Sequence, residues 1–172
     1  MSKRVFVTLV AAVTLGLAGS VLAAPGTTAN MSVTANVETS CTIGSVDTLA
    51  FGAYGGGALN GTAVIKVTCV AADGSASLSL DDGLHALAGS PGTRQMLFTD
   101  LSSNPHFLAY SLNVTDGSGA CWGGVNVCSS PHSEPVTQDG TEQDFTVYGT
   151  IPGAQSLYAG NYSDTVLVSV TF

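Results

Sequence analysis

Four cysteines are the residues with the clearest chemistry in this sequence: Cys41, Cys69, Cys121 and Cys128. An even number of cysteines in a short exported chain predicts disulfide bonds, and four cysteines allow three different pairings. A zinc site built from Cys121, Cys128, His106 and His132 is the alternative chemistry. Because oxidation after export removes the thiolates that zinc needs, the cysteines favour two disulfides and no bound metal.

The three histidines, His85, His106 and His132, lie in or beside loops that are rich in Ser and Asp. A Ser-His-Asp triad can therefore be composed from this sequence on paper. No Gly-x-Ser-x-Gly motif occurs, however, and nothing places a serine at a strand-to-helix turn. We expect solvated loop histidines, and the sequence predicts neither an enzyme nor a cofactor.

The start of the chain has the order of a secretory signal. Lys3 and Arg4 come first, an apolar run covers residues 5–18, and small residues lead to Ala23. A membrane anchor is the alternative, but it needs about 20 strongly apolar residues. This run is short, rich in Ala, Thr and Gly, and followed at once by polar sequence. The pattern predicts a signal peptide over residues 1–23.

Cleavage is expected between Ala23 and Ala24. A cut one residue later would leave Pro25 at the new N-terminus, where its ring hinders a peptidase. No later segment is apolar enough to span a bilayer. The sequence therefore predicts export and no integral membrane segment in the mature chain.

Composition restricts the fold and the partners of the mature chain. Without the signal, Lys66 and Arg94 remain against 12 acidic residues, so two minus 12 gives a net charge of −10. This charge argues against nucleic acid as a partner. About 149 residues remain, enough for one domain. Only 9% of all residues are charged, and the abundance of Gly, Ser, Thr and Val favours an all-β fold.

Both ends of the mature chain alternate between polar and apolar residues, as half-buried strands do. Over residues 27–37 one face carries Met31, Val33, Ala35 and Val37. In the last strand one face carries Val166, Val168, Val170 and Phe172. Because a short terminal strand is not stable alone, the first segment must pair with a sheet.

Other short strands are expected between these two, at residues 40–43, 49–54, 63–70, 75–80, 95–98, 107–114 and 145–151. Residues 115–144 have the composition of a long loop. Strands about every ten residues, without helical periodicity, predict an immunoglobulin-like sandwich or barrel.

Eight motifs follow one another along the chain: Ser40-Cys41-Thr42, Leu49-Ala50-Phe51-Gly52, Val67-Thr68-Cys69, Leu80-Asp81-Asp82-Gly83, Arg94-Gln95-Met96, Leu108-Ala109-Tyr110-Ser111-Leu112, Val147-Tyr148-Gly149-Thr150-Ile151-Pro152 and Ala159-Gly160-Asn161-Tyr162-Ser163-Asp164-Thr165. Their order and spacing resemble the spore coat U domain family, which includes the subunits of archaic, Csu-type chaperone-usher pili. The resemblance covers residues 40–172.

This resemblance implies an incomplete immunoglobulin-like sandwich that lacks its last strand and exposes a hydrophobic groove. A periplasmic chaperone would fill the groove first. At the outer-membrane usher, the N-terminal extension of the next subunit would replace the chaperone, which is donor-strand complementation. Residues 24–38 would form this donor-strand extension, and residues 39–172 the pilin domain. The strand from Val166 to Phe172 would form the groove wall that faces the chaperone.

The resemblance also implies that Cys41 pairs with Cys69 and Cys121 with Cys128. The sequence departs from the family pattern at residues 121–128, where a loop intervenes. A structural pilus subunit on the cell surface, assembled as a head-to-tail homopolymer that supports adhesion and biofilm formation, is the leading hypothesis. A secreted binding module or tip adhesin, and a coat or matrix protein assembled without an usher, are the alternatives.

Overall fold

The computed structural model describes residues 26–70, 74–87, 93–116 and 118–172. The expected signal peptide, residues 1–23, and its cleavage residues Ala23 and Ala24 lie outside the described residues. The chain forms two units, residues 1–35 and residues 36–172. The second unit, which we call the body, contains every described strand.

The N-terminal segment over residues 26–39 forms no strand, and each of its residues is exposed. The alternating segment therefore has no sheet partner among the described residues. A lone strand loses backbone entropy without burying apolar surface, so it does not form by itself. Its role as a donor strand, with Met31, Val33, Ala35 and Val37 as the apolar face, stays a prediction.

All regular elements among the described residues are strands, as the composition predicts. They are β1 (Ser40–Val46), β2 (Leu59–Val70), β3 (Ala76–Leu80), β4 (Arg94–Thr99), β5 (Pro105–Thr115), β6 (Ser118–Trp122), β7 (Pro131–His132), β8 (Glu134–Val136), β9 (Asp139–Ile151) and β10 (Val168–Thr171).

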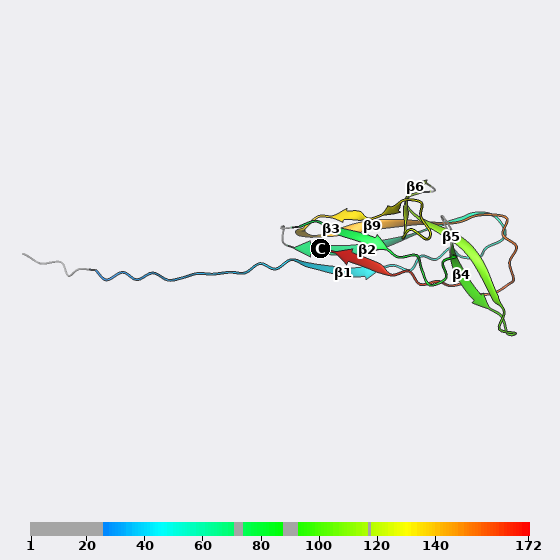
Figure 1. The fold of residues 1–172 in the computed structure, drawn as a ribbon, viewed down its shortest axis with the longest axis horizontal. Coiled ribbons are helices and arrows are strands. Elements are labelled where there is room, and N and C mark those ends of the chain that lie inside the picture. The colour runs from blue at the N-terminus through cyan, green and yellow to red at the C-terminus, as the bar shows by residue number, and fades with distance from the viewer. Residues whose placement is uncertain (1–25, 71–73, 88–92, 117) are drawn as a thin grey trace, which may run out of the picture. The chain divides into compact units, whose positions relative to one another are not determined.

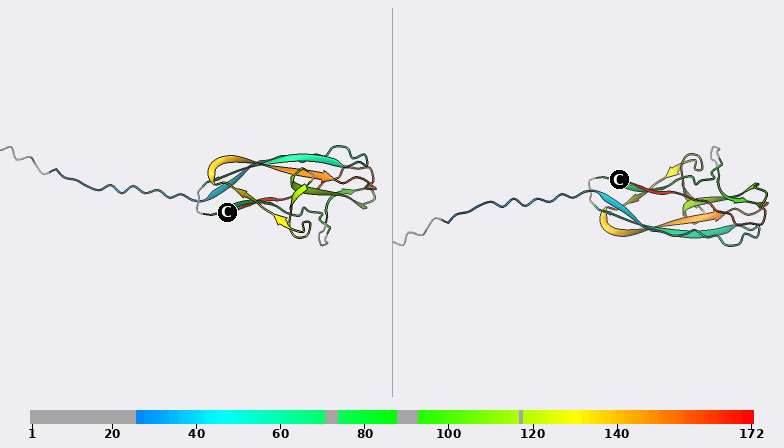
Figure 2. Two further views of the ribbon diagram at one scale, coloured as in Figure 1. Left: turned by 90° about the horizontal axis from the view of Figure 1, so that it is seen from above. Right: turned by 90° about the horizontal axis from the view of Figure 1, so that it is seen from below.

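Two sheets of the body pack face to face (Figure 2). The larger sheet has the order β1-β2-β9-β5-β6-β7, with β4 attached to β5, and the smaller has the order β10-β3-β8. Between them lie Ile65 and Val67 of β2, Leu78 of β3 and Val147 of β9, none more than 3% exposed. The predicted all-β, immunoglobulin-like sandwich is confirmed.

Strand β2 shows why side-chain alternation predicts this arrangement. Ala63, Ile65, Val67 and Cys69 are buried, while the residues between them are half exposed. On the outer face, the Lys66 ammonium lies 2.9 Å from Glu142 and 2.8 Å from Asp144, two carboxylates of the neighbouring strand β9. The sequence predicts a strand only at residues 145–151, and these cross-strand ion pairs help to stabilise the part of β9 that precedes it.

The structure differs from the sequence expectation in two segments. Residues 49–54, expected as a short strand, form none and pair with none of the described strands. Residues 115–144, expected as a loop, contain β6, β7, β8 and the start of β9. These strands form through tertiary pairing, β6 with β5 and β8 with β3, which local periodicity does not report.

The strands run between two ends of the body, which we call the base and the top. The base is where Ser40 pairs with Val70 and Thr171 pairs with Ser77. The top carries the hairpin of β4 and β5, whose turn covers residues 100–104. In Figure 1 this hairpin lies at the opposite end of the body from the C-terminus. Strands β1 and β10 are each an outermost strand of their sheet.

Candidate functional site

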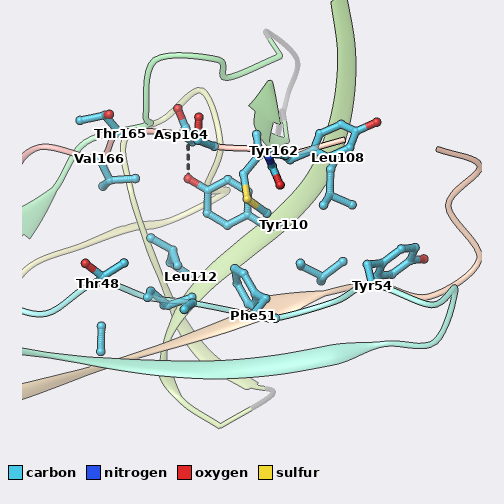
Figure 3. Close-up of a pocket in the computed structure, with 18 of the residues that line it drawn as sticks. Thr48, Phe51, Tyr54, Leu108, Tyr110, Leu112, Tyr162, Asp164, Thr165 and Val166 are labelled. Carbon is cyan, nitrogen blue, oxygen red and sulfur yellow. Dashed lines mark hydrogen bonds between the residues drawn. The ribbon is translucent and has the colours of Figure 1, made fainter. Parts of the chain in front are cut away.

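An open groove of about 1280 Å³ separates the two sheets along one side of the body. Its first rim is formed by residues 46–54, from the last residue of β1 onward, and its second rim by residues 157–166 together with Val168 at the start of β10. Figure 3 shows the two rims facing each other, with Tyr110 and Leu112 between them. The apolar side chains of the floor are Ala63, Ile65, Leu80, Met96, Leu108, Leu112, Val147 and Ile151.

The first rim is held by side chains rather than by backbone pairing. Residues 48–54 belong to no strand and, within the described part of the chain, make no backbone-to-backbone hydrogen bond. Leu49 and Phe51 pack onto Gly149 of β9, where an added Cβ would lie 2.7 Å from Phe51 Cζ and 2.8 Å from Leu49 Cδ1. This rim therefore offers a free backbone edge.

The second rim is anchored on the side away from the groove. Leu97 and Ser163 exchange backbone hydrogen bonds of 2.8 and 3.1 Å, and the Asp81 amide donates to the Leu167 carbonyl over 3.0 Å. Val166 and Val168 line the groove. Val170 packs against the core, and Phe172, at 58% exposure, lies outside the lining. The structure thus brings two of the four expected wall residues into the groove.

One polar contact joins the mainly apolar floor of the groove to the second rim. The Tyr110 hydroxyl donates to Asp164 Oδ2 over 2.7 Å, as drawn in Figure 3. The Asp164 side chain is 3% exposed and also contacts His85 Nδ1 and the Leu84 amide, each at 3.0 Å. Burial raises the pKa of the Tyr110 hydroxyl well above its usual range, and the bond to Asp164 raises it further. Tyr110 therefore stays protonated, and its hydroxyl keeps donating a hydrogen bond to Asp164.

Arg94 connects the end of β6 to the turn at Asp81. Its guanidinium, 2% exposed with the rest of the residue, donates to the carbonyls of Trp122 and Asp81. Burial lowers the pKa of this guanidinium. The Asp81 carboxylate in turn accepts from the Leu167 amide over 2.8 Å and the Gly83 amide over 2.9 Å. The buried Arg94 guanidinium is therefore hydrogen-bonded to the turn at Asp81, and the carboxylate of Asp81 in turn holds the second rim.

Both disulfides implied by the resemblance are confirmed. Cys41–Cys69 joins β1 to β2, with Cα atoms 4.1 Å apart, and Cys121–Cys128 closes a loop with a sequence separation of 7. The loop docks on Asp82, which accepts from the Gly124 amide over 2.5 Å. Since all four sulfur atoms are bonded, none of these cysteines offers a thiolate to zinc.

The histidines differ from the expectation of solvated loop residues. Each is partly buried beside an acid: His85 by Asp164, His106 by Asp100 and His132 by Glu134. The Asp100 carboxylate also holds the hairpin turn, and its bonds to Asn104 are the main reason that its pKa falls to about 2. Among the described residues, no serine hydroxyl bonds to a histidine, and no group of three acidic, histidine or cysteine side chains could hold a metal.

No described segment is a helix long and apolar enough to cross a membrane. The fold and the groove thus define a β-sandwich protein with an open, apolar edge between its two sheets. The chain belongs to the family of the Spore Coat Protein U domain, whose family model matches residues 27–169.

Two comparisons accompany this assignment. The chain is 33% identical over 179 residues to "Protein U" of Myxococcus xanthus, covering 96% of this chain and 97% of that protein. It is also similar to a chain in the crystal structure of the CsuC-CsuE chaperone-tip adhesion subunit pre-assembly complex of Acinetobacter baumannii. That similarity has 22% identity and a TM-score of 0.49, and it covers 79% of this chain and 40% of the other.

Proposed function

We propose that this chain is a structural pilus subunit that polymerises by donor-strand exchange in a chaperone-usher pathway. A periplasmic chaperone would hold the groove after export, and an outer-membrane usher would catalyse its replacement by the next subunit. The fibre would lie on the cell surface and support adhesion and biofilm formation. The observation that carries this proposal is the open groove of about 1280 Å³ between the two sheets, with its apolar floor.

The free rim and the apolar face of the N-terminal segment span the same number of residues. The apolar face from Met31 to Val37 covers six residue steps, about 20 Å of extended strand. The free rim over residues 48–54 also covers six steps. An inserted strand would place alternate apolar side chains on the groove floor and pair its backbone with the rim. Because each copy has one such segment and one groove, the product would be a head-to-tail homopolymer.

The proposal is tested with two variants that each lack one half of the contact. Val33→Asp places a charge on the apolar face of the donor segment, and Val166→Arg places one in the groove wall. We expect each variant alone to fail to assemble. An equimolar mixture should form 1:1 heterodimers, since one functional donor and one functional groove remain. Light scattering coupled to size-exclusion chromatography measures these masses.

Thr34→Asp is the matched control, because Thr34 lies on the polar face of the same segment and should tolerate a charge. Thermal unfolding of each variant shows whether the body is still folded. Assembly by the Val33→Asp variant, or by a chain lacking residues 24–36, would contradict the donor-strand role.

A coat protein assembled without an usher is the second candidate. The observations that favour it are the match to the Spore Coat Protein U domain and the identity to Protein U over almost the whole chain. The two candidates differ in what assembly requires. In the cell, a coat protein would assemble without a chaperone and usher, whereas a pilus subunit would need both for its assembly at the surface. Genes for a chaperone and an usher beside this one would favour the pilus.

A further inference from the structure

The top of the body exposes apolar side chains that the groove does not account for. Leu101 in the hairpin turn is 108% exposed, Phe107 is 43% exposed and Tyr158 is 67% exposed. The Tyr158 ring lies 4.0 Å from the His106 ring, centroid to centroid, and His106 stacks on Phe98 at 5.9 Å. Tyr158 also lines the groove, so the hairpin face that carries Phe98 and His106 is continuous with the groove, whereas Phe107 lies on the opposite face of the hairpin.

The base exposes apolar side chains as well. Val70, opposite Ser40, is 41% exposed, and Phe172, which follows Thr171, is 58% exposed. Both ends of the body therefore carry apolar surface, but in different residues. A contact between the top of one copy and the base of another joins two different surfaces, so it is heterologous and head-to-tail.

The direction of the inserted strand decides which ends meet. The second rim runs from Tyr158 at the top to Val168 towards the base. A donor that runs from base to top leaves the groove at the top, and the body of the donating copy then lies beyond the top. The donating copy's own groove stays in the same orientation, so the assembly can repeat. The opposite direction would place both neighbours of a subunit at its base.

The linker between the donor strand and β1 is short, so the two bodies must lie close together. Only Glu38 and Thr39 separate Val37 from the start of β1, so the base of the donating copy lies within about 10 Å of the end of its donor strand. On the hairpin, Leu108 is the uppermost residue that lines the groove. The hairpin continues for three more residues of β5 and its turn, about 10 Å or more. It therefore reaches the level of the incoming base.

We propose that the β4–β5 hairpin and Tyr158 form a second interface between copies of this chain, which receives the base of the subunit that donates its strand. This inference rests on the proposed function and adds a contact outside the groove. Leu101 and Tyr158 would contact apolar residues at the incoming base, with Phe172 among them. Burying this surface would slow the dissociation of assembled subunits.

In the heterodimer, the Val33→Asp chain accepts the donor strand and the Val166→Arg chain donates it. The top of the accepting chain and the base of the donating chain can therefore be changed separately. Leu101→Asp in the accepting chain should make the heterodimer dissociate about tenfold faster. The same substitution in the donating chain should have no effect, because its top faces no partner. Phe172→Ser should speed dissociation when it is in the donating chain and have no effect in the accepting chain. Leu101 and Phe172 are exposed, so neither change should disturb folding of the body.

A synthetic peptide of residues 27–39 provides the second measurement, because it fills the groove without bringing a body. Its affinity for the accepting chain should be unchanged by Leu101→Asp. Weaker peptide binding, or a heterodimer that dissociates at the original rate with Leu101→Asp in the accepting chain, would overturn the second interface. Absence of the parent heterodimer would instead be a failure of the proposed function.

Discussion

The hydroxyl of Tyr110 and the carboxylate of Asp164 form a 2.7 Å hydrogen bond between β5 and the second rim of the groove. Tyr110 is 6% exposed, and the Phe51 ring of the first rim meets its ring edge-on with centroids 6.3 Å apart. One tyrosine therefore contacts both sides of the groove. The protonation state of Tyr110 should therefore affect the stability of both rims of the groove.

The first prediction concerns alkaline pH. The pKa of Tyr110 is raised in the folded protein, so the folded state holds this proton more tightly than the unfolded state, where the pKa is about 10. The resulting stabilisation is complete below pH 10 and is lost as pH rises above it. Thermal unfolding should show that Tyr110→Phe is less stable than the wild type at pH 7 by about 1 kcal/mol. The difference should shrink above pH 10.

Tyr158→Phe is the control for this experiment, because that tyrosine is 67% exposed. The Tyr158→Phe variant should lose stability above pH 10 as the wild type does. A Tyr110→Phe variant with an unchanged alkaline profile would show that another group causes the loss.

The second prediction concerns the close approach of the first rim to β9. Gly149→Ala places a Cβ 2.7 Å from Phe51 Cζ, so Leu49 and Phe51 must move away. Overpacking of this kind costs about 1 to 3 kcal/mol of unfolding free energy, measurable by urea titration. Gly57→Ala, where nothing lies within 4 Å of the added Cβ, should change stability by less. Equal effects would mean that the rim is not packed on Gly149.

Local alternation predicted the parts of the fold that are paired along their whole length. The buried face of β2 from Ala63 to Cys69 follows directly from polar and apolar residues in turn. Val166 and Val168 alternate in the same way and line the groove, while their role as a groove wall is implied by the resemblance and stays a prediction. Residues 49–54 have a strand-like composition but form no strand, because the place beside them in the sandwich is open.

The contacts that shape the groove could not be predicted in this way. Tyr110 and Asp164 are 54 residues apart in sequence, and Arg94 reaches the carbonyl of Trp122, which is 28 residues away. Backbone carbonyls carry no sequence signature, so no motif indicates where a buried arginine will find its acceptors. The resemblance marked Arg94, Tyr110 and Asp164 as parts of motifs, but the structure is what brings them to one edge.

The third prediction concerns the two disulfides. In the chain-entropy model, loss of Cys41–Cys69, with a sequence separation of 28, should cost about 3 to 4 kcal/mol. Loss of Cys121–Cys128, with a separation of 7, should cost about 2 to 3 kcal/mol. Paired Cys→Ser variants compared by urea unfolding measure both. The intact mass of the mature protein should lie four hydrogens below that of the reduced chain, and a smaller deficit would contradict two disulfides.

The fourth prediction concerns Arg94, which joins the end of β6 to the turn that fixes the second rim. Arg94→Leu leaves the carbonyls of Trp122 and Asp81 without this donor in a buried site. The cost should be about 2 to 4 kcal/mol of unfolding free energy. Because the Asp81 carboxylate holds the Leu167 amide over 2.8 Å, the variant should also bind the peptide of residues 27–39 more weakly.

Lys66→Leu is the matched control for this variant, because it removes the other cation of the body from an exposed position on β2. Its ion pairs with Glu142 and Asp144 lie at the surface, so its loss should change stability little and leave peptide binding unchanged. If Arg94→Leu lowers stability while peptide affinity stays at the wild-type value, Arg94 supports the core but does not position the rim. Weaker binding at a temperature where the variant is still folded, as circular dichroism can establish, would place its effect at the groove edge.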